Sequence, residues 1–529
     1  MLACLLIAAL PISFDPSAGP PPQAGPAYLM INVEGTVPAA EVENFKAGLA
    51  QTIARFSRGK FTPSIDLVDI SLSLPTGEGE PLLVTTRREA FEAARTIGPE
   101  PADYDRVAVL APRAYFNPGG GCVGTVDHHV VFCEQWEDGP PGPGGLPTPV
   151  LLMHELGHSY GWRHSTFWDP TSTVNTLGEG EEENRGDLYD IMGGRWPGIW
   201  TEARFHYFNP WYMLRMGWLE PEEVREFDET TINPTVLLRP LQSPPPPPGT
   251  DVYPSAIRIR REGQTSFPSG PQVDDYWTDY WIFWRQYEGE ENSGMPGAAA
   301  CAEGPVIHLG YRTNIGRSIL LDLDPAEDWT GAPTEDAPFA VGQTFSDSGL
   351  DVTFDGIVNG LAQVTIALPT GYAAPPRPPK IVFDTSTFPA PAGSASGDSW
   401  TLAVNASDPE GGAIDRVEFW LFPNDDEFLG HMAKGRLENG ALPYPEIFPR
   451  VHDDVPAVLY GPPPLFVSIS EPSEITVNGT RHEWTTELKS GDTFFPDGIY
   501  FLVARAVTVG PEPRANVAWR PFVVDQGAP

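Results

Sequence analysis

Three histidines and one glutamate lie within a short segment of the chain, His154-Glu-Leu-Gly-His-Ser-Tyr-Gly-Trp-Arg-His164. Residues four apart share one face of an α-helix, so His154 and His158 can bring both imidazole rings to one point. Gly161 lets the chain turn back after such a helix, and His164 then reaches the same point from outside it. Because imidazole nitrogens at this spacing are typical zinc ligands, the segment predicts a Zn²⁺ site.

The same segment supplies a candidate general base. Three protein ligands leave one position of a four-coordinate zinc open for water, which is the arrangement of a catalytic site. Glu155 lies next to His154 and is placed to accept a proton from that water, whose pKa the metal lowers. The activated water attacks a carbonyl group, and Glu155 passes the proton to the leaving amine. This mechanism fixes the nucleophile and leaves the substrate class open.

The limits of the helix can be predicted from its flanking residues. Thr148 is a favourable N-cap, and Pro149 is a favourable first helical residue. Gly161 tolerates the left-handed conformation with which many helices end. We therefore expect a helix that begins after Thr148 and stops at Gly161.

The segment resembles the extended zinc motif of the metzincins, a family of zinc peptidases, at His154, Glu155, His158, Gly161 and His164. Metzincins also have a methionine turn downstream, and Gly186-Asp-Leu-Tyr-Asp-Ile-Met-Gly-Gly194 is similar to it, with Met192 as the methionine. The resemblance implies that Met192 forms an apolar floor beneath the histidines. It also implies a metzincin-type α/β catalytic domain that hydrolyses peptide bonds.

The residues after the methionine turn resemble secreted gametolysin-like and immune-inhibitor-A-like peptidases. Phe205–Leu219 is similar to the helix found there in those proteins, with Asn209 as N-cap and Pro210 as first helical residue. Looser similarity continues through later β-rich segments, so the resemblance covers Ala27–Leu368. It implies that a β-rich module follows the catalytic domain.

The pattern along the chain predicts an α+β multidomain protein. Strands and helices are expected to alternate at Tyr28–Val33, Ala39–Phe56, Ile65–Leu74, Arg87–Ile97 and Arg106–Leu110. This alternation favours an α/β layer, and residues 27–222 are expected to form the catalytic domain. Short apolar or alternating runs in residues 223–370 predict a β-rich module. Residues 378–529 are expected to form an immunoglobulin-like β-sandwich, because strand-like runs are separated there by turn clusters.

The start of the chain indicates secretion. Leu2–Leu10 is an apolar run too short to span a bilayer but long enough for the core of a signal peptide, expected within residues 1–20. No other segment has the composition of a membrane span. An oxidising compartment favours a disulfide between Cys122 and Cys133. A pairing of Cys122 with Cys301 and buried free thiols are the alternatives.

Acidic residues outnumber basic ones by 71 to 33, which gives a formal net charge of −38. This charge argues against nucleic acid or an anionic membrane as a partner and favours solubility in an extracellular medium. A local acidic cluster has two interpretations: a structural Ca²⁺ site that stiffens the loop before Met192, or a solvated loop. The cluster consists of Glu179, Glu181, Glu182, Glu183, Asp187 and Asp190.

Three functional hypotheses follow. The first is a secreted zinc-dependent endopeptidase that acts on extracellular proteins or peptides, with the C-terminal sandwich attaching it to a surface or matrix. The second is a catalytically silent, metzincin-like surface binding or adhesion protein; Glu155 argues against it, because a binding module needs no general base. The third is a zinc hydrolase with a non-peptide substrate.

Overall fold

The fold comes from a computed structural model, and the structure describes residues 27–33, 39–72, 82–99, 101, 104–112, 123–124, 130–135, 148–160, 162, 164–171, 176–183, 186–187, 189–193, 207–227, 231, 233–246, 253–260, 278–286, 304–311, 318–323, 337–372, 374, 377, 379–384, 394–395, 399–423, 465–470, 474–476, 479–487, 498–510 and 515–524. Strands predominate in it, and helices are few. The chain divides into two compact units, one of residues 1–51, 62–161 and 377–529 and the other of residues 52–61 and 162–376.

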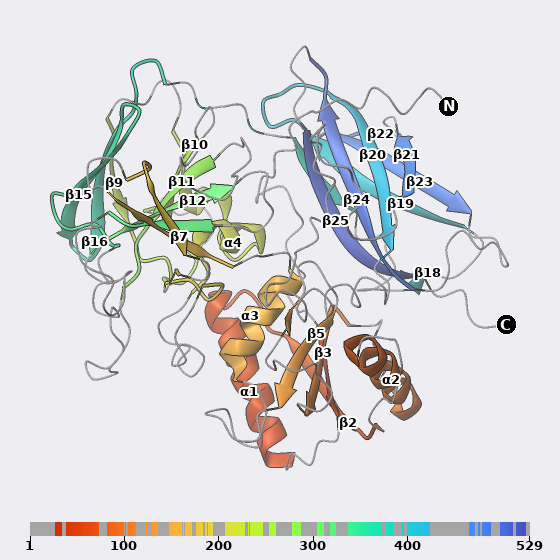
Figure 1. The fold of residues 1–529 in the computed structure, drawn as a ribbon. Helices are drawn as coiled ribbons and strands as arrows, with labels where there is room; N and C mark the ends of the chain where they lie inside the picture. Colours follow the sequence, from red (N-terminus) through yellow and green to blue (C-terminus); the bar gives the residue numbers. More distant parts are fainter. Residues whose placement is uncertain are drawn as a thin grey trace. The chain divides into compact units, whose positions relative to one another are not determined.

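The N-terminal part of the first unit is an α/β layer (Figure 1). Its sheet has the order β2-β1-β3-β5-β4, with parallel pairing except between β4 and β5. The strands are β1 (Ala27–Val33), β2 (Ser64–Ile70), β3 (Arg106–Pro112), β4 (Val123–Gly124) and β5 (Val130–Gln135), and the helices are α1 (Ala39–Phe56), α2 (Leu82–Ile97) and α3 (Pro149–Ser159). The central strands β1 and β3 are buried almost throughout, which explains why both are nearly continuous apolar runs.

A seven-stranded sheet forms the larger part of the second unit, in the order β7-β6-β13-β12-β11-β10-β8. Its strands are β6 (Thr166–Pro170), β7 (Gly180–Glu183), β8 (Val224–Arg225), β10 (Ala256–Arg260), β11 (Thr278–Phe283), β12 (Val306–Tyr311) and β13 (Ser318–Leu321). Strands β6 and β7 precede the methionine turn, yet β6 pairs with β13. The seven-stranded sheet thus includes strands from before and after residue 223, and the predicted domain limits 27–222 and 223–370 stay a prediction.

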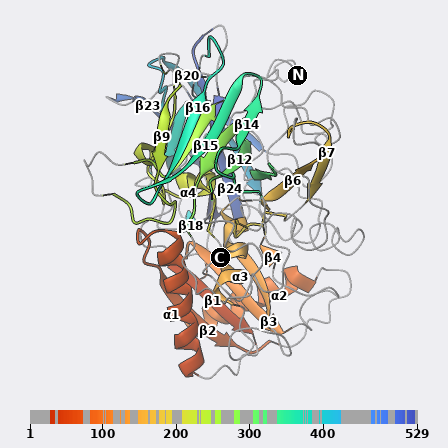
Figure 2. The same ribbon diagram turned by 90° about the vertical axis from the view of Figure 1, so that its left-hand side faces the viewer.

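A four-stranded sheet, ordered β14-β15-β16-β9, packs on the seven-stranded sheet (Figure 2). Its strands are β9 (Thr235–Leu238), β14 (Thr344–Asp347), β15 (Leu350–Val358) and β16 (Leu361–Ala367). Trp168, Ile282, Leu309 and Phe354 belong to one apolar core that both sheets share. The same unit contains α4 (Pro210–Arg215) and the short 3-10 helix Pro221–Glu223.

Two further sheets lie in the C-terminal region, ordered β17-β19-β23-β22 and β18-β25-β24-β20-β21. Their strands are β17 (Lys380–Phe383), β18 (Ser394–Ala395), β19 (Ser399–Ser407), β20 (Ile414–Pro423), β21 (Leu465–Ser470), β22 (Glu474–Thr476), β23 (Gly479–Glu487), β24 (Gly498–Thr508) and β25 (Ala515–Val524). The sheets contact each other through β17 with β24 and β25, and through β20 with β19 and β23. Two packed sheets agree with a β-rich C-terminal region, and the immunoglobulin-like assignment stays a prediction.

Several sequence predictions concern residues outside the described part of the chain. The leader at residues 1–20, Cys122 and Cys301 all lie there. Cys133 is buried on β5. Because Cys122 lies outside the described residues, the pairing of the two cysteines stays a prediction. Among the described residues, no helix combines the length and the apolarity that crossing a bilayer requires.

Candidate metal centre

Helix α3 positions two of the three histidines. The prediction for its start is confirmed: Thr148 is the N-cap, its side chain accepts a hydrogen bond from the Leu151 N–H (3.2 Å), and Pro149 opens the helix. The helix ends at Ser159, and the N–H of Tyr160 donates to the carbonyl of Leu156 (3.0 Å). Gly161, the expected end, lies outside the described residues.

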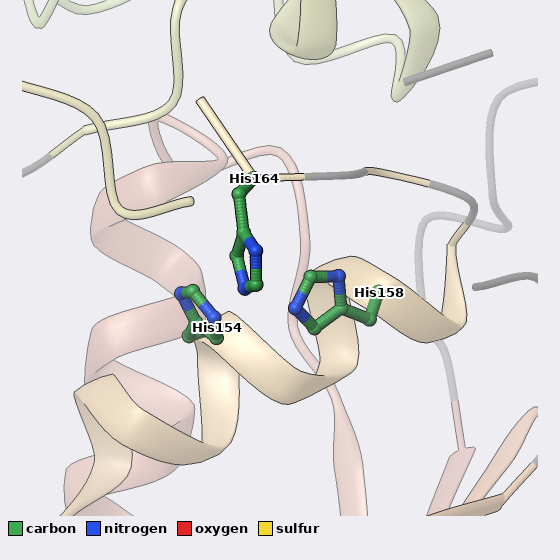
Figure 3. Close-up of side chains that lie close together, drawn as sticks. All are labelled: His154, His158 and His164. Carbon is green, nitrogen blue, oxygen red and sulfur yellow. The ribbon is translucent and has the colours of Figure 1, made fainter. Parts of the chain in front are cut away.

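The three histidines come together at one point. A ring nitrogen from each of His154, His158 and His164 lies within 4.8 Å of the other two. Figure 3 shows the rings of His154 and His158 rising from α3 toward His164, which comes from the segment after the helix. All three side chains are buried, with 2%, 3% and 5% of their surface exposed. The three histidines that the sequence singled out therefore lie together in the structure.

This donor set fits zinc. Imidazole nitrogens are common zinc ligands, and three nitrogens at these separations can converge on one small ion. Among the residues that the structure describes, this group contains no fourth histidine, cysteine or carboxylate. Three protein ligands are the number that catalytic zinc sites use. Glu155 follows His154 on α3 and is 6% exposed, so its carboxylate is also withdrawn from bulk solvent.

The third histidine of the cluster, His164, is followed by a residue that is hydrogen-bonded to the methionine turn. Met192 is fully buried, and its carbonyl accepts a hydrogen bond from the N–H of Ser165 (3.0 Å), the residue after His164. The N–H of Met192 donates to Asp190 Oδ1 (2.8 Å), which fixes the turn from within. Gly193 is required here, because a Cβ at this position would lie 1.8 Å from the carbonyl oxygen of Asp187. The turn therefore fixes the backbone beside the third histidine.

Asp187 and Asp190 are buried rather than solvated. Asp187 Oδ1 accepts from the N–H of Tyr189 (2.9 Å), and Asp190 Oδ2 accepts from the backbone and side chain of Asn209 (2.9 and 2.6 Å). Burial raises the pKa of Asp187 to about 7, with a further increase from the charge of Asp190, and burial raises the pKa of Asp190 to about 6. The solvated-loop interpretation is thus wrong for these two residues. A calcium site in the acidic cluster stays a prediction.

Asn209 connects this turn to helix α4. Its side chain accepts from the N–H of Tyr212 (3.1 Å), which confirms the predicted N-cap, and Pro210 opens the helix as expected. Tyr212 stacks on Trp162, with ring centroids 5.1 Å apart and an interplanar angle of 25°. The aromatic residues after the methionine turn are accordingly core, as Trp211 and Trp218 also show.

The C-terminal end of α3 is held by a separate polar cluster. The hydroxyl groups of Tyr28 and Tyr160 lie 2.6 Å apart, and burial raises the pKa of Tyr160 to about 12. Arg106 donates to the hydroxyl and the carbonyl of Ser159, both at 3.0 Å, and its guanidinium lies over the Tyr160 ring. These contacts tie the end of the helix to strands β1 and β3.

Sequence reasoning missed two buried polar residues, Arg285 and His308, which are 6% and 1% exposed. Arg285 follows β11 and lies near the two buried aspartates, where its charge lowers the pKa of both. His308 lies on β12 with Nε2 3.7 Å from Asp187 Oδ2. The available signal was a charged or imidazole side chain within or directly after an otherwise apolar strand.

Comparison with known proteins gives little further support. No family model and no curated protein sequence matches the chain. Among solved structures, archaemetzincin from Methanopyrus kandleri aligns with 37% of this chain and 96% of its own, at 14% identity and a TM-score of 0.25. A chaperone–substrate complex aligns with 36% of this chain and 30% of its own, at 12% identity and a TM-score of 0.22. Scores this low do not establish a shared fold, so the functional proposal rests on the site itself.

Proposed function

We propose that the protein is a zinc-dependent endopeptidase with Glu155 as general base. The observation that carries this proposal is the buried cluster of His154, His158 and His164, whose ring nitrogens lie within 4.8 Å of one another, with Glu155 on the same helix. A purely structural zinc site has four protein ligands and needs no carboxylate beside them. Three nitrogens and an adjacent carboxylate support hydrolysis.

In the proposed hydrolysis, the bound zinc activates the water and the carbonyl group, and Glu155 transfers the proton. A bound zinc lowers the pKa of water toward about 7 and polarises the carbonyl group to be attacked. The Glu155 carboxylate accepts the proton that the attacking water loses. It then gives the same proton to the nitrogen of the leaving amine, so the carboxylate is regenerated. The burial of Glu155 keeps bulk water from competing for that proton.

A peptide substrate is supported by the edge of the N-terminal sheet. Within the described residues, β4 lies at the end of the order β2-β1-β3-β5-β4, and it contacts α3. An extended peptide can add to such an edge through backbone hydrogen bonds, which gives affinity for proteins of many sequences. The resemblance to metzincins, in which the edge strand has this role, points in the same direction.

Secretion and attachment belong to the same proposal. The apolar run Leu2–Leu10 and the net charge of −38 support an extracellular location. The two packed C-terminal sheets contain none of the three histidines and can attach the enzyme to a surface or matrix. A Ca²⁺ ion in the acidic cluster would stiffen the segment before Met192.

The test is a paired assay of the wild type and Glu155→Gln on casein and a mixed peptide library, with the zinc content of both determined. We expect one zinc in each protein and a loss of cleavage of at least about 100-fold in the variant, because general base catalysis is worth about 10²–10⁴-fold. Glu92→Gln, which changes an exposed carboxylate on α2 outside the acidic cluster, is the matched control and should cleave like the wild type.

The other outcomes decide between the alternatives. Zinc in both proteins with no cleavage by either would exclude an active endopeptidase. Hydrolysis of esters or non-peptide amides by the wild type alone would then indicate a zinc hydrolase of another class. Binding to a surface with no hydrolysis of any kind would indicate a metzincin-like binding protein. Absence of zinc from the wild type would contradict the proposal at its base.

A further inference from the structure

The second unit contains a buried cluster of charged groups that the proposed chemistry does not use. It comprises Asp187, Asp190, Arg285 and His308, whose exposed fractions are 0%, 0%, 6% and 1%. Charged groups at this depth are costly unless they compensate one another, because burial removes their hydration. Arg285 is the member of the cluster that compensates the aspartate charges, because its own charge lowers the pKa of both.

Arg285 and the methionine turn share one hydrogen-bond acceptor, the carbonyl of Tyr207. Its Nη2 donates to the carbonyl of Tyr207 (3.2 Å), and the same carbonyl accepts from the N–H of Ile191 (3.1 Å). Ile191 directly precedes Met192, and Asp190 pairs with Tyr207 in a short parallel bridge. The guanidinium therefore acts on the turn through the Tyr207 carbonyl and through the charges of both aspartates.

The methionine turn is in turn hydrogen-bonded to the residue that follows His164, the third histidine. The carbonyl of Met192 holds the N–H of Ser165 at 3.0 Å, and Ser165 follows His164. On the other side, Asp187 faces His308 Nε2 at 3.7 Å, while His308 Nδ1 lies 2.9 Å from Ser318 Oγ. Residues of β12 and β13 thus close the cluster from the side of the seven-stranded sheet.

We propose that Arg285 is a positioning residue of the metal centre, which acts through the methionine turn to hold His164 in place. The seven-stranded sheet is then part of the metal centre rather than an accessory to it. This inference rests on the proposed zinc site. Metal ligands must be held to within about 0.5 Å of their productive geometry. A small shift of the turn is therefore enough to lower the affinity of the site for zinc.

The experiment compares Arg285→Gln with Arg258→Gln. Arg258 is the matched control, because it is 2% exposed, lies on β10 of the same sheet and also compensates two carboxylates, Asp279 (2.6 Å) and Glu226 (3.2 Å). Its partners belong to β11 and to the segment after β8 instead of the methionine turn. Both variants lose a buried arginine, and only Arg285→Gln loses the hydrogen bond to the Tyr207 carbonyl, the acceptor that Ile191 of the turn also uses.

The primary measurement is zinc affinity by competition with a chelator, and the second is the visible spectrum of the Co²⁺-substituted protein, which reports ligand geometry. We expect Arg285→Gln to bind zinc about 10- to 100-fold more weakly, as is typical when groups behind metal ligands are removed. Its Co²⁺ spectrum should also change. Arg258→Gln should stay within about threefold of the wild type, and Arg285→Lys, which keeps the charge, should recover part of the loss.

Each result decides the matter. Equal zinc affinities in Arg285→Gln and Arg258→Gln, whether both low or both unchanged, would overturn the positioning role while leaving the zinc site intact. Wild-type protein that binds no zinc would instead overturn the proposed function. Should Arg285→Gln fail to fold, Arg285→Lys and Arg258→Lys replace the pair, and Arg285→Lys must then bind zinc more weakly than Arg258→Lys, because lysine cannot reproduce the guanidinium geometry at the Tyr207 carbonyl.

Discussion

Replacing Arg58 by methionine will measure how strongly a buried ion pair stabilises the second unit. The Arg58 side chain has no exposed surface, and it donates to Glu223 through Nη1 (3.0 Å) and Nη2 (2.6 Å). Its Nε donates to the carbonyl of Ser243 (2.7 Å). Glu223 is also buried, accepts from the N–H of Glu220 (3.0 Å) and pairs with Arg239.

The size of the loss follows from what remains after each change. Removing one partner of a buried pair costs about 3–5 kcal/mol, because the other charge is left uncompensated. Arg239 still compensates Glu223 in Arg58→Met, so we expect about 3 kcal/mol. Glu223→Gln leaves the guanidinium groups of Arg58 and Arg239 together without a carboxylate, so we expect a loss near the upper limit of about 5 kcal/mol.

Urea unfolding followed by tryptophan fluorescence is the assay. The buried tryptophans of the second unit include Trp162, Trp168, Trp211, Trp218 and Trp281. With a denaturant dependence of about 2–3 kcal/mol per molar urea, the midpoint should fall by about 1–1.5 M in Arg58→Met and by about 1.7–2.5 M in Glu223→Gln. Lys60→Met is the control, because the Lys60–Glu220 pair (2.6 Å) is partly exposed and is worth at most about 1 kcal/mol. Equal losses in Arg58→Met and Lys60→Met would refute the reasoning.

Two further predictions concern the methionine turn. Gly193→Ala should reduce both zinc content and stability, because its Cβ would lie 1.8 Å from the carbonyl oxygen of Asp187; a variant with wild-type zinc content by elemental analysis would contradict this. The second concerns pH in zinc-free protein. The pKa of Asp187 is about 7 when folded, above its usual 3.8, so its contribution to stability is complete below about pH 3.8 and is lost as pH rises toward 7. The free energy of unfolding of the wild type relative to that of Asp187→Asn should therefore fall between pH 4 and 7. Urea unfolding of both proteins at several pH values measures this difference, and a difference that does not change with pH would contradict the prediction.

Local signals predicted the elements around the site well. Helix α1 has the expected limits, Ala39–Phe56, and Thr148 and Asn209 cap their helices as predicted. These features depend on a few neighbouring residues, because capping and amphipathic periodicity act over one or two helical turns. The same holds for the histidines, whose spacing is set by a single helix and the turn after it.

The rest depends on contacts between distant parts of the chain. Asp187 and Asp190 belong to an acidic stretch in the sequence, and nothing in that stretch shows that Asn209 and Arg285 surround them in the fold. Strand β6 likewise pairs with β13, whose sequence gives no sign of its partner. Local periodicity reports which residues form a strand but not which strand lies beside it.

The pairing of β6 with β13 has a consequence for synthesis of the chain on the ribosome. His164 lies two residues before β6, and β6 has β13 as a parallel neighbour, so the strand beside the third histidine is completed only after residues 318–321 have been made. Parallel pairing across such a long interval closes slowly, because a large loop must be ordered first. A nascent chain that has already produced all three histidines therefore still lacks β13, one of the two strands that pair with β6. We therefore expect the histidine cluster to reach its final geometry only after β13 has been made.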